Sequence, residues 1–290
     1  MKVLILIFGV ICGSTAGAFI RLASAPSAVL VVYRMFFSMV LLAPMVWLHR
    51  KEFSAMARKT LLLCICSGMS LGLHFVTYFE SVKNTSLAAS SVLVNMEVLF
   101  VALATVLIFR RKLSGKAWLA VLLAFGGAVI IALSDTGSGG SGNAILGDAM
   151  ALISAGFMSA YTLLGSVCRK NVTTTVYTYL VYFVAMVTVL VLTLASGTPL
   201  FGYGRMDVVA SLGMALVPTL LGHSVFSWCL KYLPPAMVST MRQMDPLFAA
   251  LWGFLLFGEQ PGMLVLLGGA VIICGAVLYS RTAERENKEN

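Results

Sequence analysis

The chain consists of long apolar stretches separated by short polar or basic segments. Most of the stretches hold about 20 apolar residues, which is the length that crosses a bilayer core of about 30 Å at about 1.5 Å per residue. Glycine, proline, serine and clustered charges mark their ends. The pattern predicts an all-α integral membrane protein with ten transmembrane helices, near residues 3–22, 28–48, 61–80, 86–109, 116–134, 146–167, 174–195, 208–230, 235–257 and 262–280.

Composition supports a lipid environment. Apolar residues make up 60% of the chain and charged residues 11%, against about 45–50% and about 25% in soluble domains. The net charge of +9 does not indicate nucleic acid, because the basic residues form small clusters between apolar stretches, where they orient membrane proteins. We therefore expect the lipid bilayer as a partner and no nucleic acid.

The basic residues are distributed unequally between the two sides of the predicted membrane. With the N-terminus in the cytoplasm, the cytoplasmic segments hold fifteen Lys and Arg residues, and the outer segments hold three, Arg21, Lys83 and Arg205. Cytoplasmic loops carry the excess of positive charge in membrane proteins. The bias predicts a multi-pass protein of the cell (plasma or inner) membrane with both termini cytoplasmic, ending in a charged tail at residues 281–290.

The two halves of the chain resemble each other at an offset of 148 residues. Over residues 83–132 and 231–280, fourteen of fifty positions are identical without a gap, including Met96/Met244 and Gly127/Gly275. Five spans per half would make the repeats inverted, a plan common in secondary transporters, although channels and some membrane enzymes are also duplicated. We expect a first five-helix repeat at 1–134, a Gly/Ser linker at 135–145 and a second repeat at 146–280.

Several motifs resemble the EamA-type branch of the drug/metabolite transporter superfamily. They are Tyr33-Arg34-Met35-Phe36, the stretch 222–233 (GHSVFSWCLKYL), Asp245-Pro246-Leu247-Phe248 and Leu256-Phe257-Gly258-Glu259. The resemblance covers essentially the whole chain. It implies ten helices, cytoplasmic termini and movement of small metabolites, often amino acids and usually outward.

Two carboxylates lie within apolar stretches. Glu97 is near the middle of the fourth predicted span and Asp245 near the middle of the ninth, and the 148-residue offset relates them. Charges in lipid cost about 2.5–3.5 kcal/mol on insertion scales and are often functional, so a substrate or proton site is expected here; neutralised packing residues are the alternative. Arg242 lies three residues before Asp245 and shares its helix face. Glu97 lacks a basic neighbour in sequence, which makes it the better candidate for a proton carrier.

Arg34 lies about 9 Å into the second span at about 1.5 Å per residue. Its guanidinium is expected either to bind a substrate carboxylate through its planar fork or to snorkel to the outer surface.

Other polar and aromatic residues within the spans are candidates for the lining of a metabolite site. Histidines in membrane helices relay protons or hydrogen-bond to neighbouring helices, and aromatic and amide side chains line ligand sites. The substrate-binding candidates are Arg34, Tyr78, Asn95, Glu97, His223, Trp228, Arg242 and Asp245, with His74, Tyr161 and Gln243 as further possible members.

The sequence favours a secondary transporter of a small polar metabolite, working by alternating access and using protons as a possible partner. It contains no GxxxxGK[ST] phosphate loop, HExxH or GxSxG, so we expect no enzyme activity, cofactor or metal. A membrane-embedded enzyme acting on a small or lipid-linked substrate and a channel remain the alternatives. The protein is expected to be a monomer or a homodimer. GxxxG steps at Gly9-Gly13-Gly17 and Gly68-Gly72 predict close helix seams.

Overall fold

A computed structural model describes residues 1–84, 90, 93–108, 110, 113–133, 143–257 and 263–289. Most of the predicted linker at 135–145 lies outside these residues, as does Gly258-Glu259. The helices are α1 (Lys2–Gly13), α2 (Ala16–Arg21), α3 (Ser27–Leu48), α4 (Arg50–Ala55), α5 (Arg58–Asn84), α7 (Glu97–Leu107), α8 (Gly115–Leu133), α9 (Ala144–Cys168), α10 (Thr174–Ala195), α11 (Arg205–Met214), the π-helix η1 (Ala215–His223), α12 (Ser224–Cys229), α13 (Pro235–Arg242), α14 (Asp245–Phe257) and α15 (Met263–Glu289).

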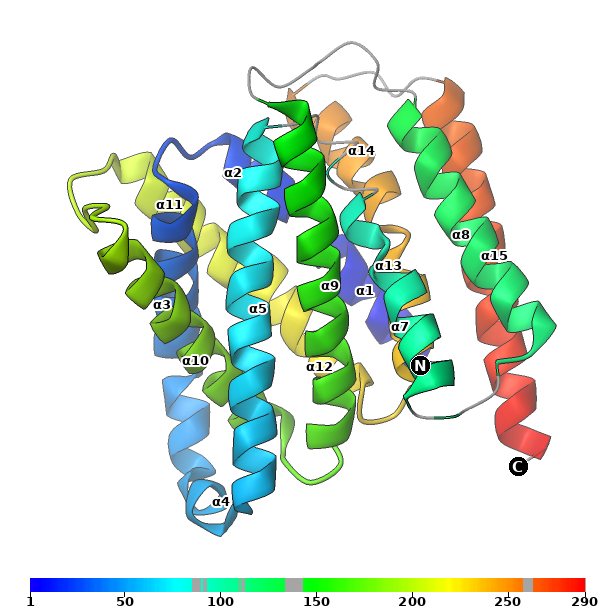
Figure 1. Ribbon diagram of the computed structural model, residues 1–290, viewed down its shortest axis with the longest axis horizontal. Helices are drawn as coiled ribbons and strands as arrows, with labels where there is room; N and C mark the ends of the chain where they lie inside the picture. Colours follow the sequence, from blue (N-terminus) through cyan, green and yellow to red (C-terminus); the bar gives the residue numbers. More distant parts are fainter. Residues whose placement is uncertain are drawn as a thin grey trace.

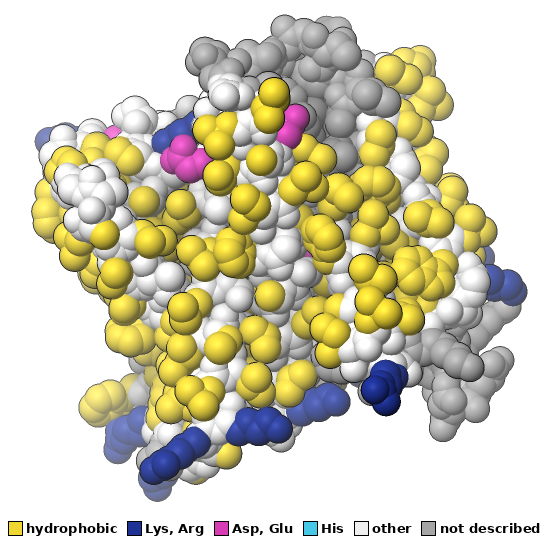
Figure 2. Space-filling view, in the orientation of Figure 1, with side chains coloured by type: hydrophobic (Ala, Val, Ile, Leu, Met, Phe, Trp, Pro, Cys, Tyr) yellow, Lys and Arg dark blue, Asp and Glu magenta, His cyan; other side chains and the backbone are white. Residues whose placement is uncertain are grey.

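The described part of the chain contains six helical stretches long and apolar enough to cross a membrane. They are Lys2–Arg21, Ser27–Leu48, Arg58–Asn84, Ile145–Cys168, Thr174–Ala195 and Arg205–Cys229, and shorter apolar helices occur at Leu93–Ala104, Gly115–Gly127 and Leu266–Tyr279. Hydrophobic side chains cover most of the face drawn in Figure 2, while Lys and Arg gather along its lower edge. An apolar belt with charged ends is the surface of a helical membrane protein.

The helices pack into one bundle in which the longest helices lie side by side (Figure 1). Helix α5 packs against α9 and α10, and α10 also packs against α3. Buried side chains of these helices, such as Leu30, Phe75, Met158 and Tyr182, form the largest hydrophobic cluster. Helices α8 and α15 form a second pair at the side of the bundle, and α1 packs against η1.

Glycine makes the α8–α15 contact close. A Cβ on Gly127 would lie 2.5 Å from the Gly268 carbonyl oxygen, and a Cβ on Gly275 would lie 2.8 Å from the Ala120 carbonyl oxygen. Only hydrogen at these positions allows the backbones to approach, as in small-residue seams of membrane helices. The predicted seam residues Gly68 and Gly72 lie similarly against α10, where Cβ atoms would meet the carbonyl oxygens of Val181 and Ala185.

Pro218 explains the π-helix η1. Proline has no N–H to donate to the carbonyl four residues earlier, so the Met214 carbonyl loses its α-helical partner. The Thr219 hydroxyl donates to the Met214 oxygen instead, at 2.7 Å. The chain therefore widens to π geometry, which is frequent at functional sites, and the Thr219 oxygen is held in the interior of the bundle.

Two helices are interrupted where the sequence suggested continuous spans. The helix of residues 93–95 is interrupted at Met96, where α7 starts with Glu97, and α13 is separated from α14 by Gln243 and Met244. The backbone bonds repeat at the 148-residue offset. The Leu99 and Phe100 amides donate to the Met96 oxygen, and the Leu247 and Phe248 amides donate to the Met244 oxygen. Glu97 and Asp245 thus lie in the first turn of a helix, not midway along one.

The charged segment that follows residue 280 is helical as far as it is described. Helix α15 continues without interruption to Glu289. As far as Glu289, the expected charged tail is therefore an extension of the last apolar helix.

Candidate functional site

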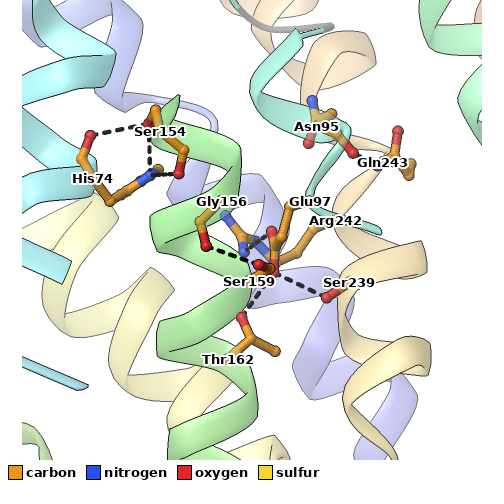
Figure 3. A network of polar contacts seen from close by, with 10 residues as sticks. All are labelled: His74, Asn95, Glu97, Ser154, Gly156, Ser159, Thr162, Ser239, Arg242 and Gln243. Carbon is orange, nitrogen blue, oxygen red and sulfur yellow. Dashed lines mark hydrogen bonds and ion pairs between the residues drawn. The ribbon is translucent and has the colours of Figure 1, made fainter. Parts of the chain in front are cut away.

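Glu97 is the centre of a buried polar cluster between α7, α9 and α13 (Figure 3). Its Oε1 accepts hydrogen bonds from the Thr162 hydroxyl at 2.7 Å and the Ser239 hydroxyl at 2.9 Å. Its Oε2 lies 2.5 Å from Nη1 of Arg242. The Glu97 side chain is 3% exposed and that of Arg242 13%, so this ion pair is almost fully removed from the surface. Charge-assisted hydrogen bonds of this kind are the strong ones in proteins.

The pairing differs from the one that the sequence suggested. Spacing along one helix favoured Arg242 with Asp245, but the ion pair that Arg242 forms in the described part of the chain is with Glu97. Arg242 ends α13 and Asp245 begins α14, and α13 packs against α7, from which Glu97 comes. Glu97 therefore has a basic partner from a distant part of the sequence, and the reason for preferring it as a proton carrier no longer holds.

A second contact joins the two helix breaks. The Gln243 side-chain amide donates to the backbone carbonyl of Asn95 at 2.5 Å, and both residues are buried. These two residues are 148 positions apart, like Glu97 and Asp245. Figure 3 shows the Asn95–Gln243 contact beside the Glu97–Arg242 pair. The candidates Asn95, Glu97 and Arg242 are thus brought together, with Asp245 next along the chain in the first turn of α14.

Arg34 lies inside the bundle, not at its surface. Its side chain is 1% exposed, which excludes the snorkelling alternative. Nε donates to the Thr219 hydroxyl at 2.6 Å, and the guanidinium carbon lies 4.1 Å from the centre of the Phe75 ring. The π-helix, α3 and α5 therefore place this cation together.

Aromatic rings connect Arg34 with Arg242. His223 packs edge-on against Phe75 at 5.1 Å between ring centres and against Phe226 at 5.8 Å. The Arg242 guanidinium carbon lies 5.1 Å from the Phe226 ring. A row of alternating basic and aromatic groups, Arg34, Phe75, His223, Phe226 and Arg242, thus crosses the interior of the bundle. We refer to these five residues as the basic–aromatic row.

His74 lies beside this row and is held in one orientation. Its Nδ1 lies 2.8 Å from the Ser154 hydroxyl and 3.2 Å from the Ser154 carbonyl oxygen. Since a carbonyl only accepts, Nδ1 carries the proton. The ring of Tyr78 stacks on that of His74 at 6.1 Å, and His223 lies 6.5 Å away. Tyr161 is fixed by a 2.7 Å hydrogen bond with Ser227.

Trp228 lies in a hydrophobic environment that also contains Phe226 and Met241. Its ring packs against Tyr232 at 4.8 Å, within the hydrophobic cluster around α1 and α12. Sequence reasoning missed Thr162, Ser239, Thr219 and Phe75. Only Ser239 carried a signal, as one of the positions identical between the halves; hydroxyl and aromatic residues are too common in membrane helices to stand out.

Comparison with known proteins identifies the architecture. The EamA-like transporter family profile matches residues 1–133 and 145–281. The chain belongs to this family. Its relatives include the pseudopaline exporter CntI of Pseudomonas aeruginosa, 26% identical over 93% of this chain and 92% of that protein. An uncharacterized transporter of Archaeoglobus fulgidus is 25% identical over 88% of each chain.

A solved crystal structure shares the fold of this EamA-like protein. It superposes with a TM-score of 0.77 at 14% identity and covers 98% of both chains. The resemblance derived from the sequence motifs is confirmed. The protein is a membrane transporter and not an enzyme, because its relatives are named transporters or exporters.

Proposed function

We propose that this EamA-like protein is a secondary transporter that exports a small polar metabolite, such as an amino acid or a related compound, by alternating access. The observation that carries the proposal is the pair of helix breaks joined by Glu97–Arg242 and Asn95–Gln243. Interrupted helices at matching places in two halves are where transporters bind substrates and ions. The relative that is named an exporter supports the outward direction.

The proposal includes ten spans arranged as two inverted repeats, 1–134 and 146–280. The α8–α15 contact supports it, since Gly127 meets Gly268 and Gly275 meets Ala120. The 148-residue offset relates Gly127 to Gly275 and Ala120 to Gly268, so it converts one contact into the other. A pseudo-two-fold axis between the two halves would have this effect. The backbone hydrogen bonds to the Met96 and Met244 carbonyl oxygens, which are also related by this offset, support the same arrangement.

Proton coupling belongs to the same proposal, with Asp245 as the carrier. The Glu97 carboxylate is already engaged by two hydrogen bonds, from Thr162 and Ser239, and by the ion pair with Arg242. Asp245 forms no hydrogen bond or ion pair with the described residues, and it is half-buried in the first turn of α14. A carboxylate without a fixed partner is available to exchange a proton or a cation.

The test is metabolite profiling of medium from cells with and without the protein. A compound that accumulates outside only with intact protein would be the substrate, and it would then be followed in reconstituted vesicles under opposite pH gradients.

We expect Asp245→Asn to abolish the response to the gradient while export down a substrate gradient persists. An Asp245→Asn protein that responds like the wild type would refute the coupling role. Identical media would refute the export function.

A further inference from the structure

The interior contains a buried cation that lacks a counter-ion among the described residues. Arg34 is 1% exposed, and the ion pair found in that part of the chain is Arg242–Glu97. A buried charge is costly unless it is paired and fully hydrogen-bonded. Within the described part of the chain Arg34 donates a hydrogen bond to Thr219, and its Nη2 atom has no hydrogen-bond partner there.

Arg169 is a second buried arginine, and its hydrogen bonds can be compared with those of Arg34. It is also 1% exposed, but its guanidinium donates to the carbonyl oxygens of Ser227 and Val172 and to the Thr174 hydroxyl. Each of its three nitrogens therefore has a partner. The incomplete set of hydrogen bonds at the Arg34 guanidinium is therefore particular to that site, because Arg169 is equally buried and has a complete set.

A second unpartnered nitrogen lies against the same ring. Among the described residues, the buried side-chain nitrogens without a hydrogen-bond partner are Arg34 Nη2 and His223 Nδ1. The guanidinium of Arg34 lies over Phe75, and the imidazole of His223 packs edge-on against it. The two residues that carry these unpartnered nitrogens thus pack against one aromatic side chain.

We propose that Arg34 and His223 form an anion subsite that binds the carboxylate group of the transported metabolite. Nη2 donates to one carboxylate oxygen and Nδ1, in the tautomer that carries its proton there, donates to the other. Phe75 supplies an apolar wall next to the carboxylate. The subsite lies at one end of the basic–aromatic row, whose other end is Arg242 beside Glu97. This inference deepens the proposed function, on which it rests, by naming the substrate as a carboxylic acid.

Stability of the empty protein separates this role from a structural one. If Arg34 is held for a ligand, Arg34→Met removes an uncompensated charge, so the melting temperature of purified protein in detergent should stay unchanged or rise. The matched control is Arg169→Met, which strands three oxygen acceptors and should lower the melting temperature by several degrees. A similar fall for Arg34→Met would refute the subsite.

Binding is tested with sodium benzoate as the probe, with benzamide as the uncharged analogue and sodium chloride and inorganic phosphate at equal ionic strength. We expect benzoate to raise the melting temperature of the wild type by about 2–4 °C. Neither Arg34→Met nor His223→Phe, which keeps an aromatic ring at that position, should respond. Equal effects of benzoate and benzamide, a response to phosphate alone, or no response of the wild type would overturn the proposal.

The two proposals fail separately. If benzoate stabilises the wild type through Arg34 and His223 but profiling finds no exported compound, the subsite stands and the transport assignment fails. If export continues with unchanged apparent affinity in Arg34→Met, the transport assignment stands and the subsite is wrong.

Discussion

At the scale of single residues, the Glu97–Arg242 pair is the feature that the sequence described least well. Each charge alone would be costly within a membrane protein. Together, with Thr162 and Ser239 completing the contacts of Glu97, they form a link between segments 145 residues apart in sequence. The link joins the helix breaks of the two halves, so any rearrangement that separates the halves has to release it.

The first prediction concerns this ion pair. Glu97→Gln leaves Arg242 without its partner, and breaking a buried pair costs about 3–5 kcal/mol, so the melting temperature of the purified protein should fall clearly. The double variant Glu97→Gln/Arg242→Gln removes both charges and should recover most of the loss. Together with the wild type and the single variant Arg242→Gln, these two variants form a double-mutant cycle. Additive effects of the two single changes would mean that the pair contributes nothing to stability.

At the scale of secondary-structure elements, local chemistry decides where helices break and how closely they pack. Pro218 leads to the π-helix and through it to the position of the Thr219 hydroxyl that accepts from Arg34. Pro246 lies in the first turn of α14 and has no N–H to donate to the Arg242 carbonyl four residues earlier, which accounts for the break between α13 and α14. In the first half Val98 occupies the matching position, and the break at Met96 occurs without proline.

The second prediction uses two neighbouring glycines of α8. A Cβ at Gly127 would lie 2.5 Å from the Gly268 carbonyl oxygen, a backbone atom that has little freedom to move. A Cβ at Gly126 would have no atom within 4 Å. Gly127→Ala should therefore lower the melting temperature and the yield of folded protein. Gly126→Ala should be neutral or stabilising by up to about 1 kcal/mol, because alanine favours helix.

The comparison of these two variants separates packing from helix propensity. Gly275→Ala provides a check from the other helix, because its Cβ would lie 2.7 Å from the Ala124 amide nitrogen. If Gly126→Ala and Gly127→Ala behave alike, the close α8–α15 seam does not exist in the membrane.

At the scale of the whole molecule, the distribution of charge agrees with the proposed orientation. Helix α4, with Arg50 and Lys51, lies at the lower end of the bundle, in the half where both termini also lie (Figure 1). Lys and Arg side chains gather along the same end in Figure 2. By the positive-inside rule we propose that this end is the cytoplasmic one.

The third prediction tests that orientation with single cysteines in a variant free of native cysteine. Lys59, in the first turn of α5, and Phe201, in the segment between α10 and α11, are both exposed. In intact cells a membrane-impermeant maleimide should label Phe201→Cys, and it should label Lys59→Cys only after the membrane is permeabilised. The reverse pattern would invert the topology.

The sequence by itself determined that this chain is a helical membrane protein of the EamA-like family. It also singled out most of the polar residues that lie near one another. These properties depend on composition, on periodic apolar stretches and on motifs, all of which are local. The offset between the halves, which is also a property of the sequence alone, relates Glu97 to Asp245 and Asn95 to Gln243.

Only the tertiary structure decided the partners. Arg242 binds Glu97 because α13 packs against α7 and brings the two side chains together, and spacing along one helix cannot describe such a contact. Burial of Arg34 depends on Phe75 and Thr219, which come from helices 41 and 185 residues away. Long-range contacts of this kind are set by how helices pack, so they are absent from any local pattern in the chain.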